Sequence, residues 1–233
     1  AEITFTLNGT ERTEQISDDT SLLELLRERC RVTSPKDACA PSGQCGACVV
    51  LVDGDKKTSC AFPARKVEGR SVVTLEGISP RERDALGTAF AESGAVQCGF
   101  CIPGMVMCGK HLLDKNPCPS RAEIGKALSG HICRCTGYVK IVDAIEQAGQ
   151  ALRSEPMPSC DRSGQIGTAL PRFRGKEMAL GEFQYLDDLS VPGLLHGVLV
   201  MSAMRSSSGS PATASSTKGA VGSLRGSAVN KPF

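Results

Sequence analysis

The first residues of the chain alternate hydrophobic and polar side chains with the period of a β-strand. Residues 2–7 alternate at period two, and the dipeptide Asn8-Gly9 after them is a strong signal for a two-residue hairpin turn. Residues 10–16 then return as a second strand. Polar N-cap candidates precede a leucine-rich stretch at 22–26 that has helical spacing. The pattern therefore predicts strand, turn, strand and helix.

Shorter apolar runs follow a loop at 34–48 that contains Pro, Gly, Ser and three cysteines. The run at 49–52 predicts a short buried strand, and Asp53-Gly54 predicts the turn after it. Residues 57–60 are expected to return as a strand, and 71–75 to form the last one. One helix with four or five strands predicts a small β-grasp-like α+β domain over residues 1–77.

From residue 78 the pattern changes to the period of helices. Pro103 fits the first turn of a helix, and a capping box at Ser120–Glu123 predicts the start of another. Helices are expected at 81–92, 105–113, 121–129 and 138–152, the last of them amphipathic. This pattern predicts an all-α four-helix domain over residues 78–153.

The C-terminal third has less periodicity. Residues 154–172 contain several Pro, Gly and Ser residues, which is typical of a linker. Residues 173–201 are expected to be partly ordered, with a strand at 195–201. Residues 202–233 are mostly Ser, Gly and Ala and are expected to be disordered.

Charge and composition exclude two classes of function. The net charge of +2 and an aromatic content of 4% without tryptophan give no basic or stacking surface for nucleic acid. No stretch approaches the roughly 20 apolar residues of a membrane span. The N-terminus has neither a secretory apolar region nor a twin-arginine signal, so we expect a cytoplasmic protein.

The twelve cysteines change the interpretation from fold to chemistry. A disulfide scaffold suits short secreted chains without a core, so metal binding is the better hypothesis here. The first set has the spacing C-x5-C-x2-C-x11-C and resembles the C-x4-C-x2-C pattern of plant-type [2Fe–2S] ferredoxins. Structural zinc is the alternative, although zinc sites usually show two short C-x-x-C knuckles. The first set consists of Cys39, Cys45, Cys48 and Cys60.

The second set pairs a C-x-x-C with a C-x-C motif, and 31 residues separate the two pairs. Each pair precedes a predicted helix, whose free N–H groups and positive dipole end favour a negatively charged, thiolate-ligated cluster. A thioredoxin-like motif would need a βαβ context, which is missing, and two disulfides are the other alternative. The second set consists of Cys98, Cys101, Cys133 and Cys135.

Two strings around the second set carry a family resemblance. Residues 97–105 (QCGFCIPGM) and 130–138 (GHICRCTGY) resemble the helical [2Fe–2S] domain of molybdenum hydroxylases, the xanthine dehydrogenase and aldehyde oxidase family. The string CGAC at 45–48 resembles the ferredoxin-like partner domain. The resemblance covers residues 2–153 and implies an α+β protein with a β-grasp ferredoxin-like domain and a helical [2Fe–2S] domain.

The same resemblance implies roles for the site residues and the partners. The second set would bind the cluster nearest a molybdopterin, the first set would bind the outer cluster, and Gln97 would lie against the molybdopterin. Electrons would pass from molybdenum through both clusters to a flavin or another acceptor. Molybdopterin and FAD would be held by partner subunits or domains, and this chain alone would do no substrate chemistry.

Two further strings refine the resemblance. Residues 36–45 (KDACAPSGQC) have five residues between the first two cysteines where the family usually has four. This string resembles selenium-dependent xanthine dehydrogenases and favours a purine over an aldehyde as substrate. Residues 175–188 and 192–197 resemble the opening of the large molybdopterin-binding subunit. The abrupt change after Met201 predicts a truncated or frame-shifted reading.

The remaining cysteines and histidines match no ligand pattern. Cys30 and Cys108 are expected to be small buried residues in helices, and Cys118 and Cys160 to be loop thiols. His111, His131 and His196 are expected to be packed or surface residues. Two alternatives to a hydroxylase component stay open at this point: a stand-alone two-cluster ferredoxin and a non-redox zinc protein.

Overall fold

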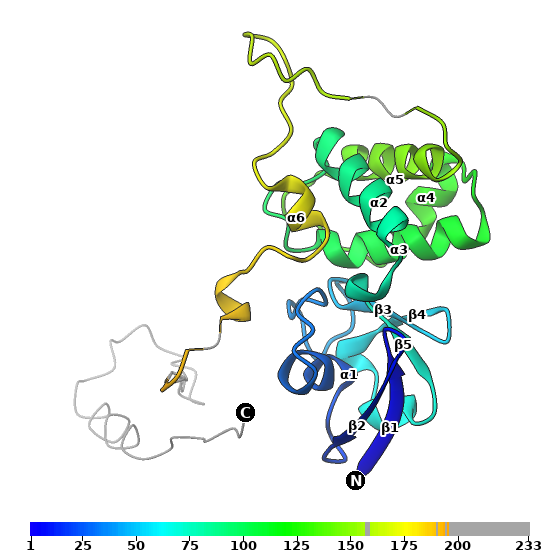
Figure 1. Ribbon diagram of the computed structural model, residues 1–233, viewed down its shortest axis with the longest axis vertical. Coiled ribbons are helices and arrows are strands. Elements are labelled where there is room, and N and C mark those ends of the chain that lie inside the picture. Colours follow the sequence, from blue (N-terminus) through cyan, green and yellow to red (C-terminus); the bar gives the residue numbers. More distant parts are fainter. Residues whose placement is uncertain (157–158, 190, 194, 196–233) are drawn as a thin grey trace, which may run out of the picture. The chain divides into compact units, whose positions relative to one another are not determined.

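Five strands form one mixed sheet in the N-terminal part of the computed structural model (Figure 1). The structure describes residues 1–156, 159–189, 191–193 and 195. The strand order is β2-β1-β5-β3-β4, in which β1 and β5 run parallel and the other neighbours run antiparallel. The strands are β1 (Glu2–Leu7), β2 (Thr10–Gln15), β3 (Val49–Val52), β4 (Asp55–Thr58) and β5 (Ser71–Val73).

Both predicted hairpin turns are present. Asn8 and Gly9 have φ values of 51° and 81°, and Asp53 and Gly54 have 50° and 81°. Positive φ at both central residues is the requirement of a type I′ hairpin turn, which Asn-Gly and Asp-Gly satisfy. The prediction for the second return strand was wrong in its bounds. β4 starts directly after the turn at Asp55, and Cys60 lies in a 3-10 turn after its end.

The predicted first helix is short and changes its winding. It starts as α1 (Leu22–Glu24), where the hydroxyl of Ser21 accepts a hydrogen bond from the Glu24 amide at 3.1 Å. The next turn, Leu25–Arg29, is a wider π-type turn closed by a hydrogen bond from the Cys30 amide to the Leu25 carbonyl. Leu22, Leu25 and Leu26 pack into the core beneath the sheet, whereas Leu23 packs against Cys48 and Cys60.

A group of helices follows the sheet in the part of the chain that the structure describes. Two begin with a capping box, at Ser79 with Glu82 and at Ser120 with Glu123, in which side chain and backbone bond reciprocally. They cluster together in Figure 1, where α2 and α5 lie side by side. The helices are α2 (Pro80–Glu92), α3 (Ile102–Lys115), α4 (Arg121–Ala127) and α5 (Tyr138–Leu152).

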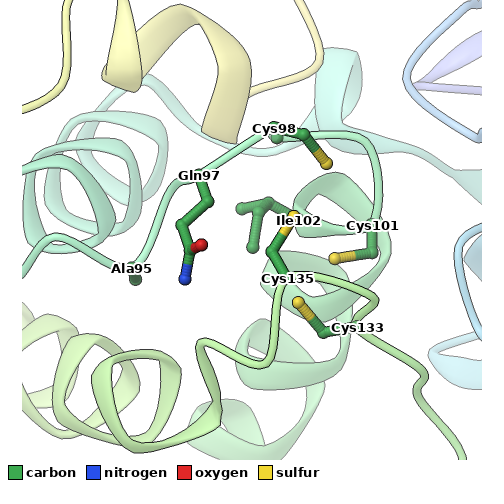
Figure 2. A pocket seen from close by; sticks show the side chains of 8 residues that line it. Ala95, Gln97, Cys98, Cys101, Ile102, Cys133 and Cys135 are labelled. Carbon is green, nitrogen blue, oxygen red and sulfur yellow. The ribbon is translucent and has the colours of Figure 1, made fainter.

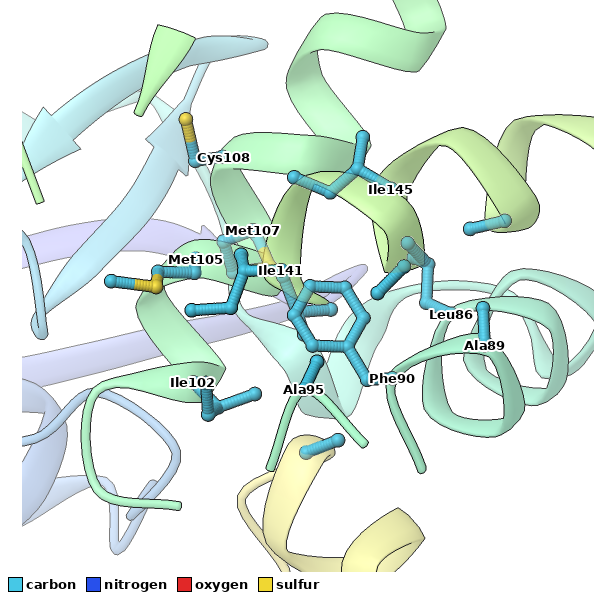
Figure 3. Close-up of a cluster of buried hydrophobic side chains, with 14 of the residues drawn as sticks. Leu86, Ala89, Phe90, Ala95, Ile102, Met105, Met107, Cys108, Ile141 and Ile145 are labelled. Carbon is cyan, nitrogen blue, oxygen red and sulfur yellow. The ribbon is translucent and has the colours of Figure 1, made fainter. Parts of the chain in front are cut away.

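Strand β3 joins two hydrophobic cores. Val50 and Val52 face the core under the sheet, whereas Val49 and Leu51 face the core among the helices. Alternate side chains of a strand point to opposite faces, so a strand covered on both faces is apolar throughout. The helical core, drawn in Figure 3, is built around Phe90, Met105 and Ile141. The sheet and the helices are therefore packed against each other within the compact unit Ala1–Asp187.

The structure describes further elements after α5. A short helix, α6 (Gly175–Ala179), packs on α2, and a 3-10 turn follows at Leu186–Asp188. The strand expected at 195–201, apart from Leu195, and the tail expected at 202–233 lie outside the described residues. Within the described part of the chain, no helix is long and apolar enough to cross a membrane.

Candidate metal centres

The first cysteine set is brought together by the loop before β3 and the turn after β4. The amide of Cys45 donates to the sulfur of Cys39 at 3.4 Å, and the amide of Cys60 donates to the sulfur of Cys48 at 3.4 Å. Cys39 is half-buried and the other three are buried. Backbone N–H groups directed at sulfur are a means of tuning an iron–sulfur site.

Two glycines allow this loop to close. Gly43 and Gly46 have φ values of +68° and +71°, a conformation that side chains rarely adopt. A Cβ on Gly43 would lie 3.0 Å from the Cβ of Ala61, and a Cβ on Gly46 would lie 2.5 Å from the ring of His131. The loop therefore wraps three thiols closely because these two positions carry no side chain.

Burial and contacts between the thiols give the cysteines of the first set different pKa values. A hydrogen bond from Cys45 lowers the pKa of Cys39, which lies at the open edge of the site. Burial raises the pKa of Cys45, and burial together with the nearby Cys48 raises the pKa of Cys60 to about 12. A bound metal ion deprotonates such thiols, so metal binding here would release protons.

The second cysteine set lies where the starts of two helices meet. Cys101 is the N-cap residue of α3, and Cys133 and Cys135 lie just before α5, whose N-cap is Gly137. Figure 2 shows the four cysteines around one pocket, with Gln97 beside it. The lining of this pocket also includes the apolar side chains of Ala95 and Ile102.

The thiols of the second set show the same division. Burial raises the pKa of Cys98 and raises the pKa of Cys101 further. A hydrogen bond from the backbone of Cys98 lowers the pKa of Cys135, and the charge of Arg172 acts in the same direction. Each set thus contains one thiol whose pKa is lowered, Cys39 in the first and Cys135 in the second, beside thiols whose pKa burial raises.

Both tyrosines of the chain bond to the backbone of the second set. The hydroxyl of Tyr138 accepts from the Cys133 amide at 2.7 Å, and the hydroxyl of Tyr185 donates to the Cys98 carbonyl at 2.7 Å. Sequence reasoning missed both contacts. The signal that was available is that the chain has only two tyrosines and that one of them closes the string GHICRCTGY.

The two cysteine sets are in direct backbone contact. The amide of Ile132, next to Cys133, donates to the carbonyl of Cys45 at 2.9 Å. His131 lies against Gly46 and is buried, and burial followed by the charge of Lys56 lowers the pKa of its imidazole to about 4. The imidazole is therefore neutral at pH 7. The loop of the first set thus contacts the segment that carries Cys133 directly.

Each set supplies four thiol donors, the number that a [2Fe–2S] cluster uses. A [2Fe–2S] cluster spreads four thiolates over two irons, so its ligands need not converge on one point. Such clusters require four thiols each. Amides directed at sulfur and an apolar pocket wall also suit them.

The other cysteines and histidines lie outside both sets, and Cys30, which was expected in a helix, instead follows the π-type turn that ends at Arg29. Cys30 and Cys108 are buried, Cys118 is exposed and Cys160 is half-buried. Cys108 donates to the Ala127 carbonyl at 3.1 Å. His111 is placed 2.9 Å from the Gly54 carbonyl, whereas His196 lies outside the described residues.

The two halves therefore define a protein built from two iron–sulfur domains. A family described as 2Fe-2S iron-sulfur cluster binding domain matches residues 5–72, and one described as [2Fe-2S] binding domain matches residues 74–146. Both matches contain one complete cysteine set.

Proteins similar to this chain specify the family. The nicotinate dehydrogenase small FeS subunit of Eubacterium barkeri is 45% identical over 63% of this chain and 93% of its own length. The xanthine dehydrogenase iron-sulfur-binding subunit of Escherichia coli O157:H7 is 41% identical over 61% of this chain and 91% of its own length. The solved aldehyde oxidoreductase of Desulfovibrio desulfuricans superposes with a TM-score of 0.73 at 36% identity, over 80% of this chain and 22% of that longer chain.

The chain belongs to the iron–sulfur subunits and N-terminal iron–sulfur regions of the molybdenum hydroxylase family. It transfers electrons through [2Fe–2S] clusters as a component of such an oxidoreductase. Relatives of this type work with a molybdopterin-containing catalytic subunit.

Proposed function

We propose that this chain carries electrons from a molybdopterin-binding catalytic partner, through the second and then the first cysteine set, to a FAD-containing or other acceptor. Cys98, Cys101, Cys133 and Cys135 would hold one [2Fe–2S] cluster, and Cys39, Cys45, Cys48 and Cys60 the other. When bound, each cluster takes up and returns one electron. The hydrogen bond between Ile132 and Cys45, at 2.9 Å, is the observation that supports this proposal most directly.

The order of the two sites is supported by their surroundings. Gln97 and Cys98 are exposed at the second site. The apolar side chains of Ile132, which precedes Cys133, and of Val139, in the first turn of α5, are 56% and 68% exposed. Exposed apolar side chains next to polar groups are typical of a surface that another protein covers. We place the catalytic partner on this surface, with Gln97 against its molybdopterin. The first site would then face the acceptor.

The proposal includes the domain organisation. Residues 1–77 would form a β-grasp ferredoxin-like domain and residues 78–153 a four-helix domain, joined by a linker at 154–172 to a segment at 173–201. The first family match ends at residue 72 and the second begins at residue 74, near the proposed boundary. A cytoplasmic location goes with this proposal, because thiols that bind iron need a reducing compartment.

Metal analysis of the chain purified without oxygen tests the proposed function. We expect about four irons and four acid-labile sulfides per chain, the count for two [2Fe–2S] clusters, with a brown visible spectrum. Cys48→Ser and Cys133→Ser should each halve the iron content. Cys30→Ser and Cys118→Ser, which change cysteines outside both sets, should leave it unchanged. Zinc without iron or colour would refute electron transfer and favour the zinc protein.

A further inference from the structure

A segment far along the chain lies across the second cysteine set. We define the strap as residues 174–186, which include α6. Lys176 pairs with Asp84 at 2.5 Å, and Glu182 pairs with Arg83. Met178, Ala179 and Leu180 in the strap are at most 5% exposed and belong to the helical part of the molecule. The strap is therefore held by buried apolar contacts as well as by ion pairs at its edges.

Tyr185 is the strap residue that reaches the metal-binding loop. Its ring makes edge-on contacts with Phe100 and Phe183, at centroid distances of 5.2 and 5.1 Å. These contacts fix the ring, and its hydroxyl then donates to the carbonyl of Cys98 at 2.7 Å. The loop is shaped for this approach, because a Cβ on Gly99 would lie 2.6 Å from the Tyr185 hydroxyl.

A positively charged side chain from the first half of the molecule lies over the Tyr185 ring. The ammonium of Lys36 lies 4.9 Å from the ring centroid, and the side chain of Lys36 is 1% exposed. Lys36 stands three residues before Cys39, and its amide donates to the carbonyl of Ala47 at 3.1 Å. Tyr185 of the strap thus contacts a buried cation of the first loop through its ring and a carbonyl of the second loop through its hydroxyl.

These groups act on the charge that reduction adds. An iron–sulfur site gains one negative charge when it is reduced, and its potential responds to nearby charges and hydrogen bonds. The hydroxyl dipole presents its positive end to the peptide of Cys98, and the ammonium lies behind it. Because the ammonium of Lys36 is buried, its interaction with the added charge is stronger than it would be at the surface.

We propose that Tyr185 is a positioning residue of the second iron–sulfur site. The Tyr185 hydroxyl fixes the Cys98 peptide. Together with the ammonium of Lys36 over its ring, Tyr185 favours reduction of the second site over reduction of the first site. This inference rests on the proposed function for the assignment of Cys98 as a ligand. It adds a residue outside both cysteine sets that would determine how the electron is shared between them.

The test removes only the hydroxyl. Tyr185→Phe in the full chain keeps the ring, and a redox titration followed by electron paramagnetic resonance reports both clusters separately. The signal that Cys133→Ser abolishes belongs to the second site. We expect the equilibrium constant for reducing that site to fall roughly fivefold, as for the loss of one hydrogen bond. For a one-electron couple this is a shift of about 40 mV to lower potential. The first site should not move.

A matched variant separates the hydroxyl from the strap. Glu182→Gln weakens the ion pair with Arg83 but leaves Tyr185 in place, so the potential of the second site should stay unchanged. The proposal is overturned if Tyr185→Phe leaves that potential unchanged or if Glu182→Gln shifts it equally. If the unaltered chain binds no iron, the proposed function fails instead. Two normal clusters with no shift in Tyr185→Phe would refute only the role of Tyr185.

Discussion

At the scale of single residues, Gly104 determines how closely α3 approaches the first cysteine loop. A Cβ at this position would lie 2.2 Å from the carbonyl oxygen of Gly46 and 3.0 Å from the Cα of Ala47. Both neighbours are backbone atoms, so they cannot move aside by rotating a side chain. The contact between the two halves thus depends on the absence of one methyl group.

We predict that Gly104→Ala lowers the free energy of unfolding by about 1–3 kcal/mol, the usual range for overpacking a tight contact. Gly125→Ala is the matched control, because that glycine lies in α4 with no atom within 4 Å of the added Cβ. The control should gain about 0.4–1 kcal/mol from the reduced entropy of the unfolded chain. Denaturant unfolding of both variants measures the difference, and equal effects would contradict the proposed close contact.

Residue-level prediction from the sequence reaches furthest where chemistry is encoded locally, and the ligand roles of the eight cysteines stay a prediction. The spacing of the cysteines was enough to divide eight of them into two sets, and the structure brings each set together. The contact between Tyr185 and Cys98 joins residues 87 positions apart, and no local pattern marks it. The amide of Ile132 was equally invisible, since every residue but proline has such a donor.

At the scale of elements, the helix starts carry local stability. The hydroxyl of Ser120 accepts from the Glu123 amide at 3.3 Å, and the carboxylate of Glu123 accepts from the Ser120 amide at 2.7 Å. The pKa of Glu123 is lowered mainly by the hydrogen bond from the Ser120 hydroxyl and then by the one from the Ser120 amide. This capping box stabilises the first turn of α4, which lies in the chain between Cys101 and Cys133 of the second set.

We predict that Ser120→Ala lowers the free energy of unfolding by about 1 kcal/mol, the usual loss for an N-cap hydroxyl. Ser129→Ala changes an exposed serine in the turn after α4 and should cost less than about 0.5 kcal/mol. Thermal or denaturant unfolding at neutral pH measures both. A loss in Ser129→Ala as large as that in Ser120→Ala would argue against the cap.

Elements were predictable to the degree that their signals are local. The turns Asn8-Gly9 and Asp53-Gly54 and the capping box at Ser120 were recognised because turns and caps depend on short-range chemistry. The start of β4 was missed because Asp55 and Lys56 look polar, and only their pairing with β3 defines the strand. The widened turn at 25–29 follows from packing and has no sequence signal that we can identify.

At the scale of the whole molecule, an exposed apolar side chain marks the surface on which we propose that the catalytic partner binds. Val139 is 68% exposed at the first turn of α5, next to the loop of Cys135. If the catalytic partner covers this surface, a charge placed there would be buried without a counterion. Burying an unpaired charge is strongly unfavourable.

We predict that Val139→Asp weakens binding to a molybdopterin-containing catalytic subunit at least tenfold, while the iron content stays unchanged. Ile166→Asp is the matched control, because Ile166 is fully exposed in the linker and should leave the affinity unaltered. A binding titration between the separately purified subunits checks both. Equal affinities for the two variants would place the partner elsewhere, and no binding by the unaltered chain would favour a stand-alone ferredoxin.

The two cysteine sets also act as cross-links once they are filled. The first closes the loop from Cys39 to Cys60 and the second closes the longer loop from Cys98 to Cys135, which contains α3 and α4. Closing a loop removes conformations from the unfolded chain, and each doubling of its length adds about 0.6 kcal/mol to that effect. Loss of the second cluster would therefore release more chain entropy than loss of the first. The cysteines that hold the electron-carrying clusters would then also determine how much of the helical half stays folded.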